Sequence, residues 1–97
     1  MIDDDTRWAL EVVRQAFKGE NLQVYLFGSR ANNSSHAHSD IDIALLAKAP
    51  IDLFQLSELR EVFEQSHLLV SIDLVDLNRV DKAFKQKVLK DGLRWKG

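Results

Sequence analysis

Two aspartates, Asp40 and Asp42, stand one residue apart at the start of an apolar run. Gly28 and Ser29 end the preceding apolar run, and the ten residues 30–39 separate the two pairs. Side chains two residues apart on an extended segment point to the same face, so the two carboxylates are expected to lie on one side of a strand. Such a pair can chelate a divalent metal ion.

A third carboxylate, Asp73, lies in the next apolar run along the chain. Three carboxylates in a chain without cysteine favour a hard cation such as Mg²⁺ or Mn²⁺, which is commonly shared with substrate phosphates. Two such metals can clamp the attacking and leaving oxygens of a phosphoryl displacement. In this interpretation Asp40 and Asp42 bridge the metals. Asp73 binds only the metal that activates the attacking hydroxyl, and it can also accept the hydroxyl proton.

The run Gly28, Ser29 and Arg30 supplies the groups that such a reaction needs on its phosphate side. A glycine lets the backbone approach a triphosphate closely, and a serine offers both a hydroxyl and an N–H group. Arg30 adds a forked donor for phosphate charge. The sequence therefore predicts nucleotidyl transfer with loss of pyrophosphate.

The elements that must position these residues follow from hydrophobic periodicity and capping residues. Helices are expected over residues 3–18, 52–65 and 79–91, with Asp52 and Asn78 as caps of the last two, and a helical turn is expected near Ser29. Strands are expected over residues 22–27, 41–46 and 69–77. The expected inward residues of the last two helices are Phe54, Leu56, Leu59, Val62 and Phe63, then Val80, Ala83, Phe84 and Val88.

The order of these elements predicts where the polar residues meet. A strand, a helix and another strand imply a right-handed crossover between parallel strands. If the first two strands are antiparallel, the end of the first strand and the starts of the other two lie at one edge of the sheet. Gly28, Ser29, Asp40, Asp42 and Asp73 would then converge. The expected fold is α/β (α+β), a small mixed sheet of three or more strands packed with about three helices.

Composition sets the wider limits. A chain of 97 residues is expected to form a single domain, residues 1–97, with a modest core. The formal net charge of −2 does not favour strong non-specific attraction to nucleic acid or to a membrane. The absence of cysteine, of a long apolar run and of a basic leader predicts a cytoplasmic protein without a membrane span.

The segment GSRANNSSHAHSDIDI resembles the signature of the minimal nucleotidyltransferases, small members of the DNA polymerase beta superfamily, in which Gly-Ser precedes Asp-x-Asp by ten residues. The tail SIDLVDLNRVDKAFKQKVLKDG is also similar to the third strand and closing helix of that family. The resemblance implies a polymerase-beta-like nucleotidyltransferase fold. It further implies that Gly28 and Ser29 hold the nucleotide triphosphate, that Asp40 and Asp42 hold the metals, and that Asp73 is the third catalytic carboxylate.

The same resemblance implies a partner and a reaction. Such proteins are typically antitoxins paired with a small helical RNase toxin of the higher eukaryotes and prokaryotes nucleotide-binding (HEPN) class. They transfer AMP from ATP to a tyrosine hydroxyl of the toxin and silence it. The chain departs from the family's usual Gly-Ser-Arg-Ala-Arg-Gly, because it has Asn32 where a basic residue is common. This change predicts weaker phosphate binding and lower activity.

Two other functions remain open at this point. A small domain with Asn32 could act as a non-catalytic antitoxin that covers its partner, and a basic tail could serve nucleotidyl transfer to RNA or a small molecule. The basic residues of the tail are more typical of a solvated helix face than of a binding surface. The loop histidines His36 and His38 are more typical of solvent-facing side chains than of catalytic residues. The basic residues are Arg79, Lys82, Lys85, Lys87, Lys90, Arg94 and Lys96.

Overall fold

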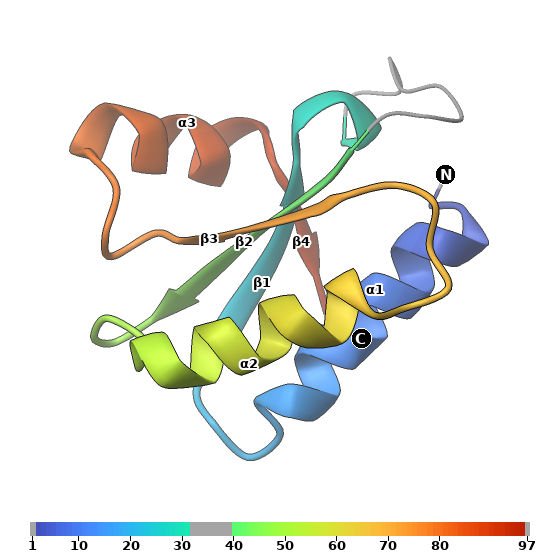
Figure 1. Ribbon diagram of the computed structural model, residues 1–97. Coiled ribbons are helices and arrows are strands. Elements are labelled where there is room, and N and C mark those ends of the chain that lie inside the picture. The colour runs from blue at the N-terminus through green and yellow to red at the C-terminus, as the bar shows by residue number, and fades with distance from the viewer. Residues whose placement is uncertain (1, 32–39, 97) are drawn as a thin grey trace.

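The computed structural model describes residues 2–31 and 40–96 (Figure 1). Three α-helices, one 3-10 turn and four strands follow one another in these residues. They are α1 (Asp4–Ala16), β1 (Leu22–Phe27), η1 (Gly28–Arg30), β2 (Ile41–Ala47), α2 (Leu53–Glu64), β3 (Ile72–Asp76), α3 (Lys82–Asp91) and β4 (Leu93–Trp95).

The four strands form one mixed sheet in the order β3-β2-β1-β4. β1 is antiparallel to β2, and β2 is parallel to β3, so the predicted strand directions are confirmed. The end of β1 therefore meets the starts of β2 and β3 at one edge of the sheet. β4 pairs antiparallel with β1 on its other side.

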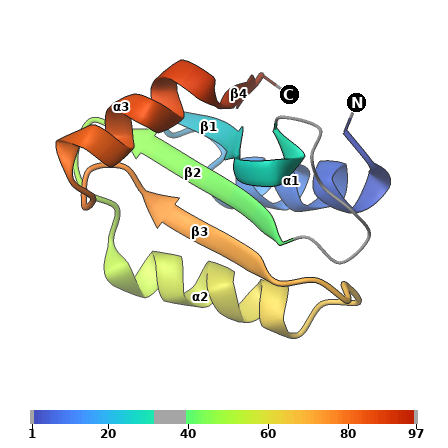
Figure 2. The ribbon, with the colours of Figure 1, turned by 90° about the horizontal axis from the view of Figure 1, so that it is seen from above.

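Helices cover both faces of the sheet. α1 and α2 lie together on one face and α3 lies on the other, as the two perpendicular views show (Figures 1 and 2). Alternate residues of each strand divide between the faces, because successive side chains of a strand point in opposite directions. The α1/α2 face contains the larger core, including Val24, Ile43 and Leu74. The α3 face contains a smaller cluster built on Tyr25 and Ala44.

The helix starts are fixed by aspartate caps. Asp3 accepts a hydrogen bond from the Thr6 amide at 2.8 Å, and Asp52 accepts one from the Phe54 amide at 3.1 Å. The predicted Asn78 cap of the last helix is wrong, because Asp81 accepts the bond from the Phe84 amide at 2.7 Å. Asn78 instead donates its side-chain N–H to the Ala47 carbonyl, and α3 begins three residues later than expected.

Two of the predicted apolar stripes are narrower in the structure. On α2, Leu56, Leu59 and Phe63 are buried, whereas Phe54 is 69% exposed and Val62 also faces outward. On α3 only Val88 of the expected inward residues is fully buried, since this short helix covers only part of its sheet face. The third strand is also shorter than predicted, because it begins at Ile72 and Leu69 is 96% exposed.

β4 has no counterpart among the predicted strands. It is three residues long and follows Gly92 directly, so its pattern of Leu93, Arg94 and Trp95 is too short to predict a strand. A separate feature concerns membranes: within residues 2–31 and 40–96, each helix is too short or too polar to cross a bilayer.

Candidate active site

Strand register places two of the three predicted carboxylates side by side. Asp42 pairs with Asp73 across the parallel β2/β3 ladder and with Phe27 across the antiparallel β1/β2 ladder. Residues paired in register point to the same face of a sheet, so both carboxylates lie on the α3 face. Asp40 lies directly before β2 and is exposed to solvent. The predicted convergence at this edge is therefore present.

Gly28 closes against the Asp42 carboxylate. Its φ of 76° lies in the left-handed region that glycine adopts without strain. A Cβ atom at this position would collide with Asp42 Oδ2, so the close approach needs a residue without a side chain. Ser29 follows in η1, half-buried, at the expected helical turn. Gly28 and Asp42 thus meet although residues 29–41 separate them in the sequence.

The electrostatics of Asp42 are those of a crowded carboxylate. Burial raises the pKa of Asp42, and the negative charges of Asp73 and Asp40 raise it further, while the Arg30 guanidinium opposes this rise. No described residue donates a hydrogen bond to the Asp42 or Asp73 side chain. Carboxylates that repel one another favour an added positive charge at their centre.

Arg30, predicted to bind phosphate, contacts the start of α1 and the residue before β2. Its side chain turns toward the start of α1, where it pairs with Asp3 at 2.5 Å and donates to the Thr6 hydroxyl at 3.3 Å. Its Nε also donates to the Asp40 carbonyl at 3.3 Å. Burial acts to raise the pKa of Asp3, but hydrogen bonds from Thr6 and the charge of Arg30 lower it overall. Arg30 thus links the start of α1 to the residue that opens β2.

The donor set fits a metal that is shared with a substrate. In residues 2–31 and 40–96, no three carboxylate or histidine side chains are gathered closely enough to hold a metal ion by themselves. Mg²⁺ typically takes only one or two carboxylates and fills its shell with water and substrate phosphates. The aligned pair Asp42 and Asp73 suits that kind of site. Asn32, His36 and His38 lie outside the described residues.

Two cavities each include one residue of this group, Asp73 in one and Gly28 in the other. A cavity of about 460 Å³ opens at the free edge of β3, and Asp73 forms part of its wall together with Arg60 and Glu64 of α2. A second cavity, of about 310 Å³, lies between the end of β1 and α3 and includes Gly28. Space for one ligand therefore exists beside Gly28 and for another beside Asp73.

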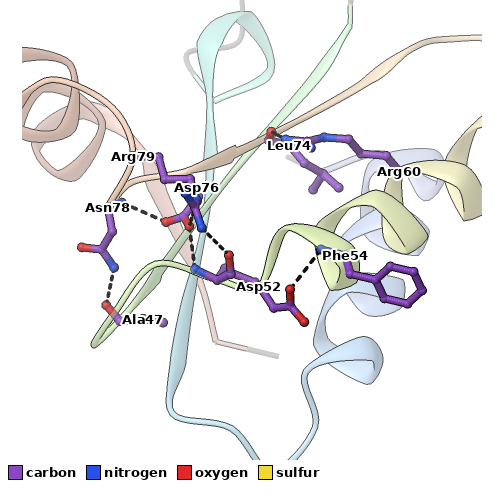
Figure 3. A network of polar contacts seen from close by, with 9 residues as sticks. Ala47, Asp52, Phe54, Arg60, Leu74, Asp76, Asn78 and Arg79 are labelled. Carbon is purple, nitrogen blue, oxygen red and sulfur yellow. Dashed lines mark hydrogen bonds and ion pairs between the residues drawn. The ribbon is translucent and has the colours of Figure 1, made fainter.

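Sequence reasoning missed a fourth aspartate that positions this site. Asp76, at the other end of β3, is 4% exposed and accepts hydrogen bonds from the amides of Ile51 at 2.8 Å and Asn78 at 2.9 Å (Figure 3). Arg79 pairs with it at 3.3 Å and donates to the Ile51 carbonyl. The network joins the end of β3 to the segment before α2 and to the turn that follows the strand. The sequence signal for the role of Asp76 was a carboxylate at a strand position that faces the core.

Residues 13–94 match the family model described as Polymerase beta, Nucleotidyltransferase. This chain belongs to that family. The matched segment includes Gly28, Ser29 and the carboxylates Asp40, Asp42 and Asp73. Membership confirms the resemblance to nucleotidyltransferases.

Relatives and solved structures agree with this assignment. This chain is 39% identical over 69 residues to protein adenylyltransferase MntA of Shewanella oneidensis, and the match covers 71% of this chain and 49% of that protein. The chain spans about half the length of the curated relatives it matches. A crystal structure of a toxin–antitoxin complex with AMP-PNP matches at a TM-score of 0.74 and 32% identity, covering 94% of this chain and 73% of the other.

A second solved structure, of tri-AMPylated Shewanella oneidensis HEPN toxin in complex with an MNT antitoxin, matches at a TM-score of 0.67 and 30% identity. It covers 94% of this chain and 69% of the matched chain. These likenesses confirm the predicted polymerase-beta-like nucleotidyltransferase fold, with a four-stranded mixed sheet and three helices.

Proposed function

We propose that this chain transfers AMP from ATP, with Mg²⁺ or Mn²⁺, to a tyrosine hydroxyl of a HEPN-class RNase in the cytoplasm, and so acts as the antitoxin of a toxin–antitoxin pair. The observation that carries the proposal is the meeting of Gly28, Asp42 and Asp73 at one edge of the sheet in a nucleotidyltransferase. The relatives named as adenylyltransferases and the solved complexes with a HEPN toxin and with AMP-PNP support the donor and the acceptor.

The proposal assigns the triphosphate to the Gly28 side of the site and the acceptor to the Asp73 side. The triphosphate lies over Gly28 and Ser29, and Asp42 packs directly against this glycine. The acceptor hydroxyl enters from the cavity that includes Asp73. Asp42 stands between the two, against Gly28 on one side and opposite Asp73 on the other. In this proposal the hydroxyl attacks the α-phosphorus from the Asp73 side, and pyrophosphate leaves on the Gly28 side.

The chemistry assigns a role to each carboxylate. Asp40 and Asp42 would hold the divalent cations, and Asp73 would complete the site on the acceptor side. The bound cations supply charge neutralisation for the attacking and leaving oxygens. Asp73 accepts the tyrosine proton while the tyrosine oxygen forms a bond to the α-phosphorus. The bond between the α-phosphorus and its bridging oxygen breaks, and pyrophosphate leaves past Gly28 and Ser29.

The direct test is label transfer. The chain, the HEPN protein encoded beside it and ATP labelled at the α-phosphate are incubated with Mg²⁺, and label on the HEPN protein is measured. The double variant Asp40→Ala plus Asp42→Ala should lose the label. The matched control is Asp4→Ala plus Asp5→Ala, two exposed aspartates on α1 that should keep it. The proposal fails if the wild type binds its partner and transfers nothing, or if the site variant labels as well as the control.

A non-catalytic antitoxin is the alternative, because the basic residue common in the family is replaced by Asn32. The same double variant decides between the two functions. Full inhibition of the partner's RNase activity by the Asp40→Ala plus Asp42→Ala chain would show that covering the partner is enough. Loss of inhibition together with loss of label would show that modification is required. Label on RNA or on a small molecule would identify a different acceptor.

A further inference from the structure

β3 is an edge strand, because β2 is its only strand neighbour among the described residues. The Ser71 carbonyl accepts a hydrogen bond from the Ile41 amide of β2 at 3.0 Å, so it points toward β2. Within one peptide group the carbonyl and the following amide point in opposite directions, and along a strand this pattern repeats every second residue. The amides of Ile72 and Leu74 therefore point away from β2, toward the free edge.

A groove runs along this free edge. It is the cavity of about 460 Å³ described above, and it is lined by the continuous segment 68–74 and by Arg60, Phe63 and Glu64 of α2. In Figure 2, α2 lies beyond β3 as seen from the rest of the sheet. The helix therefore provides a surface beside the last strand, where one more strand would lie.

Arg60 covers one position of the edge. Its guanidinium donates to the Leu74 carbonyl at 3.0 Å, as Figure 3 shows. Charged side chains on edge strands commonly prevent unintended pairing. The outward amides of Ile72 and Leu74, however, have no acceptor among residues 2–31 and 40–96. The edge thus has one covered carbonyl and two open donors.

The position of the edge indicates what would pair with it. Asp73 lies between the two open amides, and the proposed function requires a tyrosine hydroxyl at this carboxylate. Residues paired on neighbouring strands point to the same face, with their Cβ atoms about 5 Å apart. A tyrosine paired with Asp73 in an added strand would therefore project from the α3 face, beside the carboxylates. A small acceptor has no backbone to pair with the edge, so the open amides favour a protein acceptor.

We propose that the free edge of β3 binds an extended segment of the partner protein as an added strand, with the acceptor tyrosine in register with Asp73. The inference rests on the proposed function and deepens it, because it states how the protein acceptor is held. Backbone hydrogen bonds from Ile72 and Leu74 supply the affinity, as in other cases of strand addition. The Arg60 guanidinium leaves the Leu74 carbonyl when the segment pairs there.

Amide hydrogen exchange of the wild type tests the pairing. It is measured by NMR with and without the HEPN protein encoded beside this chain, in the absence of ATP. The Ile72 and Leu74 amides should exchange fast in the free chain and slow by roughly tenfold or more in the complex, as expected for a gained hydrogen bond. The Asp73 and Val75 amides, which face β2, are the internal control and should be slow in both.

Three exchange results would contradict a claim made here. If the complex forms and the Ile72 and Leu74 amides exchange as in the free chain, the inference is overturned. If their protection in the free chain rises with its concentration, a second copy occupies the edge and the inference is equally overturned. If no complex forms, the partner in the proposed function is itself contradicted.

A substitution separates the backbone amide from its side chain. Ile72→Pro removes an amide that β2 does not use, at the first residue of the strand, where proline is tolerated. Ile72→Ala keeps the amide and is the matched control. The KM for the HEPN partner in label transfer should be roughly tenfold higher in Ile72→Pro than in Ile72→Ala, with the same kcat.

The split between KM and kcat decides the interpretation. Equal KM values in the two variants would overturn the inference. A lower kcat with an unchanged KM would show that residue 72 supports the carboxylates rather than the partner, and would also overturn it. A wild type that binds the partner and transfers no label contradicts the proposed function instead.

Discussion

The two ends of β3 carry aspartates that the fold treats in opposite ways. Asp76, on the α1/α2 face, is buried and receives hydrogen bonds from two backbone amides and a contact from the Arg79 guanidinium. Asp73, on the α3 face, is exposed, and no described residue donates a hydrogen bond to it. It faces Asp42, another carboxylate, across the strand pair.

The two environments distinguish a carboxylate that stabilises the fold from one that is available for chemistry. A buried charge whose acceptor oxygens are satisfied by the protein lowers the free energy of the folded state, and its removal leaves donors without a partner. A carboxylate that faces another carboxylate raises that free energy until a cation arrives. We therefore expect Asp76 to be needed for folding and Asp73 to be needed for chemistry.

The largest expected effect is on transfer by Asp73→Asn. Loss of a general base typically lowers the rate by roughly a hundredfold to ten-thousandfold. The substitution also removes a repulsive contact, and for this reason the unfolding free energy should not decrease. Single-turnover label transfer and urea unfolding of the same protein preparation measure the two quantities. Asp5→Asn on α1 serves as the surface control. If Asp73→Asn lowered the unfolding free energy as well as the transfer rate, Asp73 would be needed for folding, as Asp76 is expected to be.

The next effect is on stability, in Asp76→Ala. The Ile51 and Asn78 amides lose their acceptor, so the unfolding free energy should drop by about 3 kcal/mol. Urea denaturation measures it. Asp73→Ala is a close control, since it makes the same truncation on the same strand and should change stability by less than about 0.5 kcal/mol. Equal losses in the two variants would show that both carboxylates serve the fold.

The smallest effect is a pH dependence at Asp42. Burial and the charges of Asp73 and Asp40 raise the pKa of Asp42, so the folded protein binds this proton more tightly than the unfolded chain does. Above the raised pKa, Asp42→Asn should therefore be more stable than the wild type in the absence of metal. The advantage should shrink as the pH falls through the raised pKa toward the ordinary value of an aspartate.

Chelator-treated protein and paired urea titrations across that pH range measure the difference between the two chains. Because only the difference is used, titration of the other carboxylates largely cancels. Adding Mg²⁺ at neutral pH should reverse the order, since the cation binds the wild type more tightly than Asp42→Asn. An advantage that stays constant with pH would mean that repulsion at Asp42 has no energetic weight.

Much of the site could be predicted because strand alternation and strand order are enough to bring its residues together. β1 has the predicted bounds, and the faces of Asp42 and Asp73 follow from period-two alternation. The contacts of longer side chains could not be predicted. Arg30 reaches the start of α1, a contact between residues 27 positions apart in sequence, and no local pattern encodes it.

The missed details share a physical cause. Asn78 and Asp81 are both residue types that cap helices well. Asp81 caps α3, whereas the Asn78 side chain donates to the Ala47 carbonyl at the end of β2. The sequence likewise offered Asp76 as one more polar residue in a strand, because its partners come from the segment before α2 and from the turn after β3. Tertiary partners settled each case, and the local sequence does not contain them.

The three-residue step from Asp73 to Asp76 has an evolutionary consequence, because it places chemistry and architecture on opposite faces of one strand. If the proposed function holds, substitutions on the α3 face can end AMP transfer while the α1/α2 face keeps its packing. A lineage could therefore lose catalysis in a single step and still inherit a well-folded scaffold. Pseudoenzymes that retain the aspartate at position 76 and have lost the one at position 73 are the descendants that this design would leave.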